Sequence, residues 1–182
     1  MALRNIIEEG DPILKKHCRP VVKFDERLHT LLDDMEQTLR ESDGVGLAAP
    51  QVGILRRAVL VLETNVPKGE EEKVIELINP VITFSEGREG GPEGCLSVPG
   101  VFGFVYRPTH IVVEAQDRYG QPFKLEARDL TARAVCHEMA HLEGELFTDI
   151  ADHIMDDKEL EKYYGKEAVQ QRKRPKILMG QR

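Results

Sequence analysis

Residues 137–141 read His-Glu-Met-Ala-His, a spacing that places both histidines at one site only if the segment is a helix. At about 100° per residue, His137 and His141 lie about 40° apart around a helix, one turn from each other. Glu138 then lies at the edge of the same face, about 60° from His141. Two imidazoles can bind one metal ion there while the carboxylate takes a proton from a metal-activated water. The motif therefore predicts a metal-dependent hydrolase, although two surface histidines and a glutamate can also produce it by chance.

The histidine pair needs a third protein ligand, and Cys95 is the best candidate. Phe147 stands where the H-E-x-x-H-x-x-G-x-x-H motif of one protease group has its third histidine, although Gly144 matches that motif. Cys136 points away from the pair on the predicted helix, which favours a buried structural thiol. Cys95 follows the glycine-rich segment REGGPEG, whose backbone can come close to an ion. A thiolate binds zinc or ferrous iron well, and three ligands leave a fourth position for water. We therefore predict one divalent metal ion bound by Cys95, His137 and His141.

The remaining periodicities predict a mixed α and β chain. Asp25 is expected to cap a helix whose apolar residues recur at three- and four-residue spacing as far as Leu39. Turn residues in 117–122 predict a hairpin, and the short spacing of the strand-like runs favours antiparallel pairing. The segment 85–95 reads as a loop, and 130–144 as a helix with Asp129 at its N-cap. The expected strands are 56–63, 73–80, 101–108, 109–117 and 123–128.

Composition limits the class of protein and its surroundings. A chain of 182 residues suits a single domain, which we expect over residues 1–165, followed by a basic tail over 166–182 that is a frayed helix or disordered. The net charge of −7 argues against DNA or other nucleic acid as the main partner. The start of the chain lacks the apolar run of a secretory signal, and the longest apolar run, 58–62, is too short for a membrane span. Three cysteines without a disulfide framework favour a reducing compartment, so we expect a cytoplasmic protein.

Three segments resemble the signature motifs of the peptide deformylase family, in the same order and at similar separations. They are GVGLAAPQ (44–51), EGCLS (93–97) and HEMAHLEG (137–144), and the likeness extends over roughly residues 3–155. The resemblance implies an α+β fold in which antiparallel β-sheets wrap around a central helix that carries the HExxH motif. It also implies metal-dependent hydrolysis of the formyl group from the N-terminal formylmethionine of newly made polypeptides, with release of formate.

The resemblance assigns roles to further residues, position by position. It implies the same three metal ligands, and it makes Glu138 the general base that later acts as the acid for the leaving amine. Gln51 and the backbone N–H of Leu96 are similar to the donors that hold the oxyanion, which preorganised donors stabilise well in a dry site. Gly46 is similar to a glycine whose backbone lines the substrate cleft. The resemblance further implies ferrous iron as the natural ion, with zinc, nickel or cobalt able to replace it.

One position departs from the family pattern. The family has H-E-x-D-H, and Ala140 stands at the place of the aspartate. An aspartate there would orient a neighbouring group, so its loss is expected to cost about 10- to 100-fold in metal affinity or activity if nothing substitutes. Arg107, in the strand after the cysteine segment, is a candidate for a charge that has lost its partner.

Two other functions compete with this interpretation, and the tail suggests a partner. A zinc-type metallopeptidase shares H-E-x-x-H, and a metal-binding deformylase-like protein could have lost catalysis. Retention of Glu138 favours an enzyme, because a structural metal would not need that carboxylate. Residues 166–182 carry six basic residues against Glu167, so they could give a weak contact with ribosomal RNA, or they could simply be a solvated tail.

Overall fold

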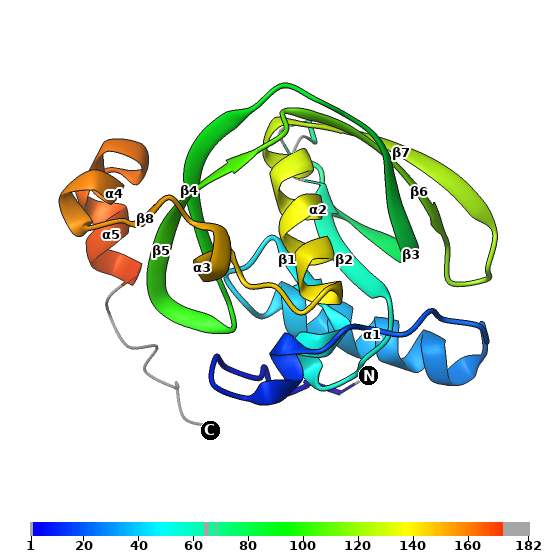
Figure 1. The fold of residues 1–182 in the computed structure, drawn as a ribbon. Coiled ribbons are helices and arrows are strands. Elements are labelled where there is room, and N and C mark those ends of the chain that lie inside the picture. The colour runs from blue at the N-terminus through cyan, green and yellow to red at the C-terminus, as the bar shows by residue number, and fades with distance from the viewer. Residues whose placement is uncertain (1, 64–65, 68, 173–182) are drawn as a thin grey trace.

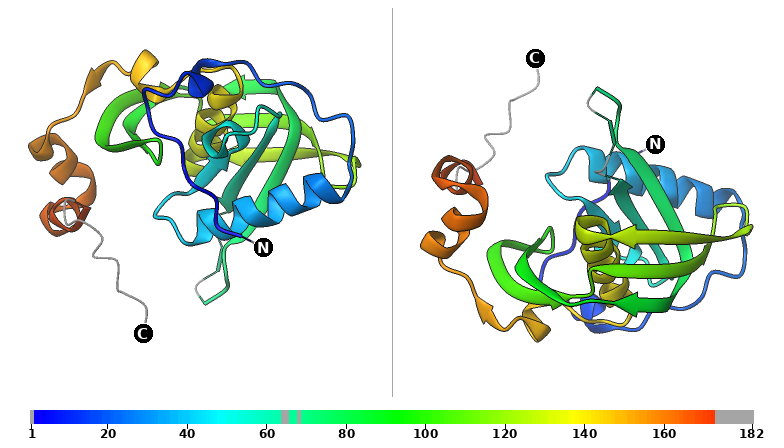
Figure 2. Two further views of the ribbon diagram at one scale, coloured as in Figure 1. Left: turned by 90° about the horizontal axis from the view of Figure 1, so that it is seen from below. Right: turned by 90° about the horizontal axis from the view of Figure 1, so that it is seen from above.

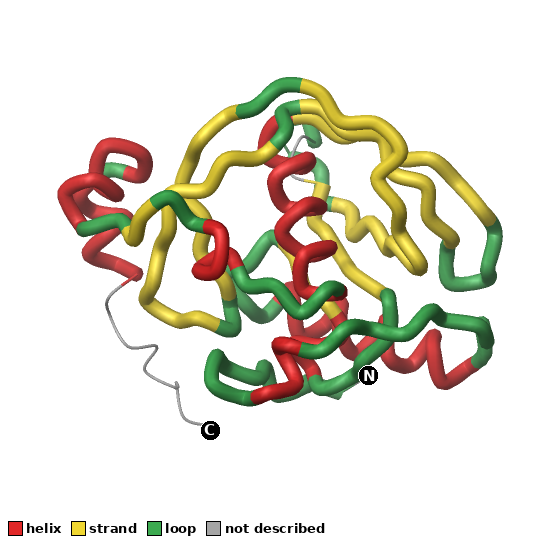
Figure 3. Tube along the Cα trace, in the orientation of Figure 1, coloured by secondary structure: helices red, strands yellow, loops and turns green. Residues whose placement is uncertain are grey.

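A central helix, α2 (Asp129–Leu142), lies between two antiparallel sheets in the computed structural model, which describes residues 2–63, 66–67 and 69–172 (Figure 1). α2 packs against strands at both edges of the larger sheet, β1 and β7, so this sheet curves around the helix (Figures 1 and 3). The arrangement confirms the expected α+β fold. The larger sheet has the order β1 (Gly46–Ala48), β2 (Ala58–Glu63), β3 (Lys73–Glu86), β6 (His110–Gln116) and β7 (Pro122–Arg128).

The curved sheet has apolar residues on both faces, and each face has its own core. The face toward α2 packs residues such as Val59, Leu77 and Val113 against Val135 of the helix. The other face packs against α1 (Glu26–Arg40), which lies outside the sheet (Figure 2). The side chain of Asp25 accepts hydrogen bonds from two backbone N–H groups in the first turn of α1, as the sequence predicts. The first of these cores holds α2 against the sheet, because it contains residues from Ala132 to Leu142 of the helix.

The three-stranded sheet corrects one prediction, because residues 85–95 are not a loop. β3 continues to Glu86, and β4 (Glu89–Cys95) pairs with β5 (Val98–Arg107), which pairs in turn with β8 (His153–Ile154). Glycine-rich composition suggested a loop, but aromatic rings of β5 occupy the space that side chains on β4 would fill. A Cβ atom on Gly94 would lie 2.6 Å from the Phe102 ring. The glycines therefore permit close packing of a strand that ends at Cys95.

The start of α2 also differs from the prediction. The helix begins at Asp129, Arg128 precedes it as the cap residue, and no side chain caps the first turn. Asp129 has a φ of +48° and its N–H donates to the carbonyl of Thr109 at 2.8 Å, so its backbone is fixed by the neighbouring strand rather than by capping. The predicted hairpin between β6 and β7 is present, with Asp117 accepting from the N–H groups of Tyr119 and Gln121.

Three short helices follow α2 and lie beside the three-stranded sheet. Val169 is buried with Met155 and Leu160, which fixes α5 against α4 (Figure 2). Residues 173–182 of the predicted tail lie outside the described residues, and a domain boundary at 165/166 stays a prediction. No helix within the described ranges is long and apolar enough to cross a membrane. The remaining helices are η1 (Pro12–Lys15), η2 (Ala49–Val52), α3 (Phe147–Ile150), α4 (Asp157–Tyr164) and α5 (Lys166–Arg172).

Candidate metal centre

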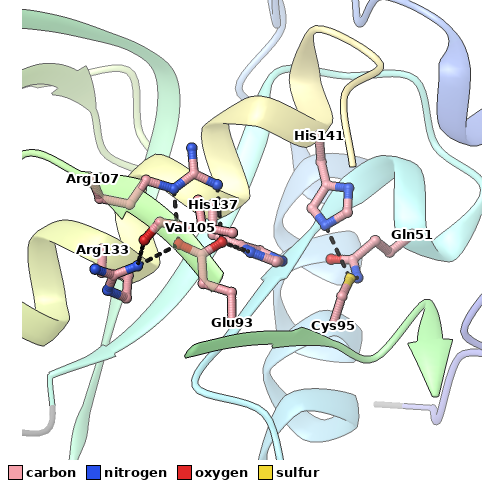
Figure 4. Close-up of polar contacts among 8 residues, drawn as sticks. All are labelled: Gln51, Glu93, Cys95, Val105, Arg107, Arg133, His137 and His141. Carbon is pink, nitrogen blue, oxygen red and sulfur yellow. Dashed lines mark hydrogen bonds and ion pairs between the residues drawn. The ribbon is translucent and has the colours of Figure 1, made fainter. Parts of the chain in front are cut away.

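The structure brings the three predicted metal ligands together. The donor atoms of Cys95, His137 and His141 lie within 4.8 Å of one another, and Cys95 Sγ is 3.4 Å from His141 Nε2 (Figure 4). Cys95 ends β4, whereas both histidines project from α2, so the cluster lies where the smaller sheet meets the central helix. Two imidazoles and a thiol form a donor set that suits zinc or ferrous iron.

His141 has the surroundings of a neutral ligand rather than of a hydrogen-bonded core residue. Its side chain is fully buried, and its Nδ1 has no hydrogen-bond partner in the described part of the chain. Burial lowers the pKa of His141 to about 3, so the imidazole stays neutral at physiological pH. A neutral imidazole whose Nε2 faces a thiol is ready to bind a cation, so the residues present fit a metal ion.

His137 is oriented by a buried carboxylate, Glu93. Nδ1 of His137 lies 2.9 Å from Glu93 Oε2, which leaves its Nε2 for the cluster (Figure 4). Arg107 binds both oxygens of Glu93 at 2.8 and 3.0 Å, and Arg133 reaches one of them at 3.1 Å. Burial alone would raise the pKa of Glu93, but hydrogen bonds from His137 and Arg107 lower it to about 2. Glu93 is therefore a carboxylate that holds the ring of His137.

This network corrects the expectation about Arg107. Arg107 was expected to lack a partner, yet it forms a bidentate pair with Glu93 and is itself buried. The carboxylate that orients His137 comes from β4, not from the neighbouring position on the helix. Glu93 thus supplies the carboxylate that orients His137, and the effect of Ala140 stays a prediction.

Phe147 occupies the position of the protease motif's third histidine and contacts the cluster in a different way. The residue is fully buried, and its ring stacks on that of His137 with centroids 6.1 Å apart and planes at 26°. It belongs to an apolar cluster against which Cys95 also packs. The side of the cluster from which a third histidine would bind is therefore formed by apolar side chains.

Glu138 is buried beside the cluster. Its Oε2 atom is shielded from solvent and has no hydrogen-bond partner among the described residues. Burial raises the pKa of Glu138 to about 7. A carboxyl group with a pKa near neutrality suits both removal and return of a proton at physiological pH.

The residues assigned to substrate and oxyanion also lie around the cluster. Gln51 accepts a hydrogen bond from the N–H of Ala48 at 2.8 Å, which directs its Nε2 toward Ser97 Oγ at 3.1 Å and Cys95 Sγ at 3.4 Å. Leu96 follows Cys95 directly and is half-buried against the core beneath α1. The amide of Gln51 and the backbone after Cys95 thus border the same space.

Gly46 lies on β1, an edge strand of the larger sheet, whose one partner among the described strands is β2. The carbonyl of Val45 accepts from the N–H of Leu62 at 2.8 Å. In the alternating pattern of an antiparallel ladder, the N–H and C=O of the next residue, Gly46, then point to the open edge. This edge can pair with an extended peptide.

Sequence reasoning missed Glu93 and Arg133 as parts of the site. Glu93 stands next to the glycine of the EGCLS segment, so its place in a motif was visible, but its partners were not. Arg133 lies one turn before His137 and donates to the carbonyl of Val105 at 2.8 Å (Figure 4). It also donates to the carbonyl of Glu89 at 2.8 Å. Glu93, Arg107 and Arg133 come from β4, β5 and α2, and only the folded structure shows that their side chains meet.

Comparisons with known proteins agree with this geometry. The sequence profile of the family described as "Polypeptide deformylase" matches residues 3–157. The chain is 52% identical to the peptide deformylase of Caldicellulosiruptor bescii over 88% of this chain and 93% of that protein. Among solved structures, the peptide deformylase of Thermotoga maritima has a TM-score of 0.78 at 37% identity, covering 84% of this chain and 99% of that one. The enzyme from Legionella pneumophila has a TM-score of 0.76 at 35% identity, covering 96% and 100%.

Proposed function

The chain belongs to the polypeptide deformylase family, and on that premise we propose that Cys95, His137 and His141 hold its catalytic metal ion. The protein is a metal-dependent hydrolase that removes the formyl group from the N-terminal formylmethionine of nascent polypeptides. The observation that carries the site assignment is the convergence of the three donor atoms within 4.8 Å of one another.

Glu138 is proposed as the group that moves the proton. A divalent ion at the cluster supplies Lewis acidity and lowers the pKa of water. The buried Glu138 carboxylate accepts the proton of the attacking water and later returns it to the amine nitrogen as the C–N bond breaks. Its Oε2 atom has no hydrogen-bond partner among the described residues and is available for this transfer.

Gln51 and Leu96 are proposed as the donors to the oxyanion. Attack on the formyl carbon moves negative charge to the formyl oxygen, and fixed N–H donors stabilise that charge. The backbone N–H of Ala48 donates to the side-chain oxygen of Gln51, and this hydrogen bond directs the N–H₂ group of Gln51 toward Cys95. The backbone N–H of Leu96 is the second donor, and the open edge at Gly46 is proposed to pair with the substrate backbone.

The primary test compares wild type with Glu138→Ala. We expect wild type to release formate from formyl-Met-Ala under anaerobic conditions with ferrous iron. The variant should retain one metal ion per chain but lose at least about 100-fold in kcat, as general-base removal does. Metal-loaded wild type that releases no formate would contradict the activity, and an active variant would contradict the role of Glu138.

The identity of the ion is proposed as Fe²⁺, with Zn²⁺, Ni²⁺ or Co²⁺ able to occupy the site. Mixed thiolate and imidazole donors accept all of these ions. Metal analysis of protein purified anaerobically from its own host would identify the resident ion. Zinc alone in such a preparation would contradict the iron assignment.

Two further proposals concern surroundings. The three free cysteines favour a reducing compartment, so we propose a cytoplasmic location, which cell fractionation would test.

We also propose that the basic segment 166–182 contacts ribosomal RNA electrostatically. Because Val169 is buried against α4, truncation after Arg172 tests the segment's end without removing that contact. Unchanged ribosome co-sedimentation at low salt, both for this truncation and for one after Gly165, would contradict the contact.

A further inference from the structure

Gly46 and Glu138 are in close contact across the gap between β1 and α2. A Cβ atom built on Gly46 would lie 2.5 Å from Oε1, 2.7 Å from Cγ and 2.8 Å from Cδ of Glu138. Carbon atoms in contact are best separated by about 3.5–4.0 Å. The side chain of Glu138 therefore fills the volume that any side chain at position 46 would need.

The backbone conformation of Gly46 does not explain why the residue is glycine. Its φ is not among the positive values found at eight other glycines, so an alanine could adopt the same conformation. An alanine on an edge strand is ordinarily no worse than glycine. Glycine is required at position 46 because the side chain of Glu138 occupies the space that a larger residue would need.

Packing is also what fixes the carboxylate. Oε2 of Glu138 has no hydrogen-bond partner within the described ranges, so no donor to that oxygen sets the direction of the side chain. The contact with Gly46 reaches Cγ as well as the carboxylate, and rotation of the terminal bond alone would not relieve a clash there. A group added at position 46 must move the whole side chain away from its present rotamer.

From these observations we propose that Gly46 is a positioning residue for Glu138. Because Gly46 has no side chain, the carboxylate of Glu138 can occupy its present position. This role is separate from any part that the backbone of Gly46 plays in binding the peptide. The inference rests on the proposed function, in which Glu138 moves the proton. It predicts that a single methyl group at position 46 disables proton transfer while the metal ligands and the peptide-binding edge stay intact.

The test uses Gly46→Ala, with Gly90→Ala on β4 as the matched control, because Gly90 is also a strand glycine without a positive φ. A Cβ on Gly90 would lie 2.5 Å from Cζ of Phe104 and 2.9 Å from Cε1 of Tyr106, a contact as tight as that at Gly46 but with rings that have no assigned role in the site. For Gly46→Ala, kcat on formyl-Met-Ala should fall about 100-fold, the lower end of what a general base contributes. KM should change less than about threefold, because ground-state binding is kept. The Gly90→Ala control should lose less than about fivefold in kcat, since its nearest contacts are with Phe104 and Tyr106 rather than with Glu138.

Two readouts besides activity separate positioning from substrate binding. Metal content per chain should equal that of wild type, and calorimetry should give an unchanged affinity for the product Met-Ala. A raised KM and a weakened affinity for Met-Ala at unchanged kcat would overturn the proposal, because Gly46 would then act on the peptide alone.

Shortening the carboxylate provides the decisive comparison. Glu138→Asp withdraws the carboxylate by one methylene, so position 46 gains space. In the Glu138→Asp background, Gly46→Ala should cost less than about fivefold in kcat, a strong departure from additivity that residues in contact show. An equal cost in both backgrounds would overturn the contact. Should Gly46→Ala alone fail to fold, recovery of folding in the double variant supports the contact, and failure in both contradicts it. Full activity of Glu138→Ala would instead refute the base assignment, which is a separate outcome.

Discussion

Glu93 receives hydrogen bonds from three charged or polar side chains while it is almost fully buried. Replacing it with glutamine keeps the shape but removes the charge that Arg107 and His137 need. We expect Glu93→Gln to lower affinity for zinc about 10- to 100-fold, since it loosens the orientation of a ligand. We also expect a loss of about 3–5 kcal/mol in the free energy of unfolding, because Arg107 would be left as an uncompensated buried charge.

Chelator competition and urea unfolding of the metal-free protein measure the two effects. Glu89→Gln is the matched control, because Glu89 lies on the same strand with an exposed side chain and contributes only its carbonyl to the network. Wild-type zinc affinity in Glu93→Gln would show that His137 needs no carboxylate partner.

The pKa of Glu93 predicts how stability depends on acid. The group titrates near 2 in the folded protein and near 4.5 ordinarily, so the unfolded chain binds more protons between these values. The stabilisation by Glu93 is therefore fully present above pH about 4.5 and is lost as pH falls toward about 2. Unfolding free energies of metal-free wild type and Glu93→Gln should differ most near pH 6 and converge toward pH 3. A difference that grows with acid would contradict the ionised state of Glu93.

At the scale of the elements, sequence periodicity predicted the α1 and α2 helices and the β6–β7 hairpin because each is encoded locally. The proposed metal ligands, which the structure brings together, were also predicted from local spacing on one helix and from a glycine-rich approach to Cys95. β4 was missed because its glycine-rich sequence forms a strand only when it packs beside the aromatic side chains of β5. The partners of Glu93 were missed for the same reason, since they come from β5 and α2. Contacts between distant segments leave no periodic signal in a single chain.

Gly144, just after α2, shows how an element end can depend on its neighbours. Its φ is +74°, and a Cβ there would lie 2.5 Å from the carbonyl carbon and oxygen of Lys15. Gly100 has nearly the same φ, +77°, but nothing within 4 Å of the added carbon. Gly100→Ala should cost about 1–2 kcal/mol for the left-handed backbone alone. Gly144→Ala should cost clearly more, since backbone cannot move aside as a side chain can. Urea unfolding of both variants compares them, and equal losses would mean that the Lys15 contact relaxes freely.

At the scale of the whole molecule, the proposed metal ion would join two sheets through α2. Cys95 belongs to the smaller sheet, whereas His137 and His141 lie on the helix that fills the curved sheet, so an ion bound to all three resists separation of these layers. Adding Zn²⁺ at about 100 times its dissociation constant should therefore raise the free energy of unfolding of the metal-free protein by about 2.7 kcal/mol. His141→Ala should lose most of this gain, because a ligand is removed.

Glu138→Ala should keep the zinc-dependent gain, since its carboxylate stands beside the cluster without being a ligand. Thermal unfolding with and without zinc, at equal protein concentration, measures the gain for each variant. The comparison separates binding from catalysis: His141→Ala loses both, whereas Glu138→Ala loses only turnover. If Glu138→Ala lost the zinc-dependent gain as completely as His141→Ala, the carboxylate would be a metal ligand, and the proton would have to move through another group.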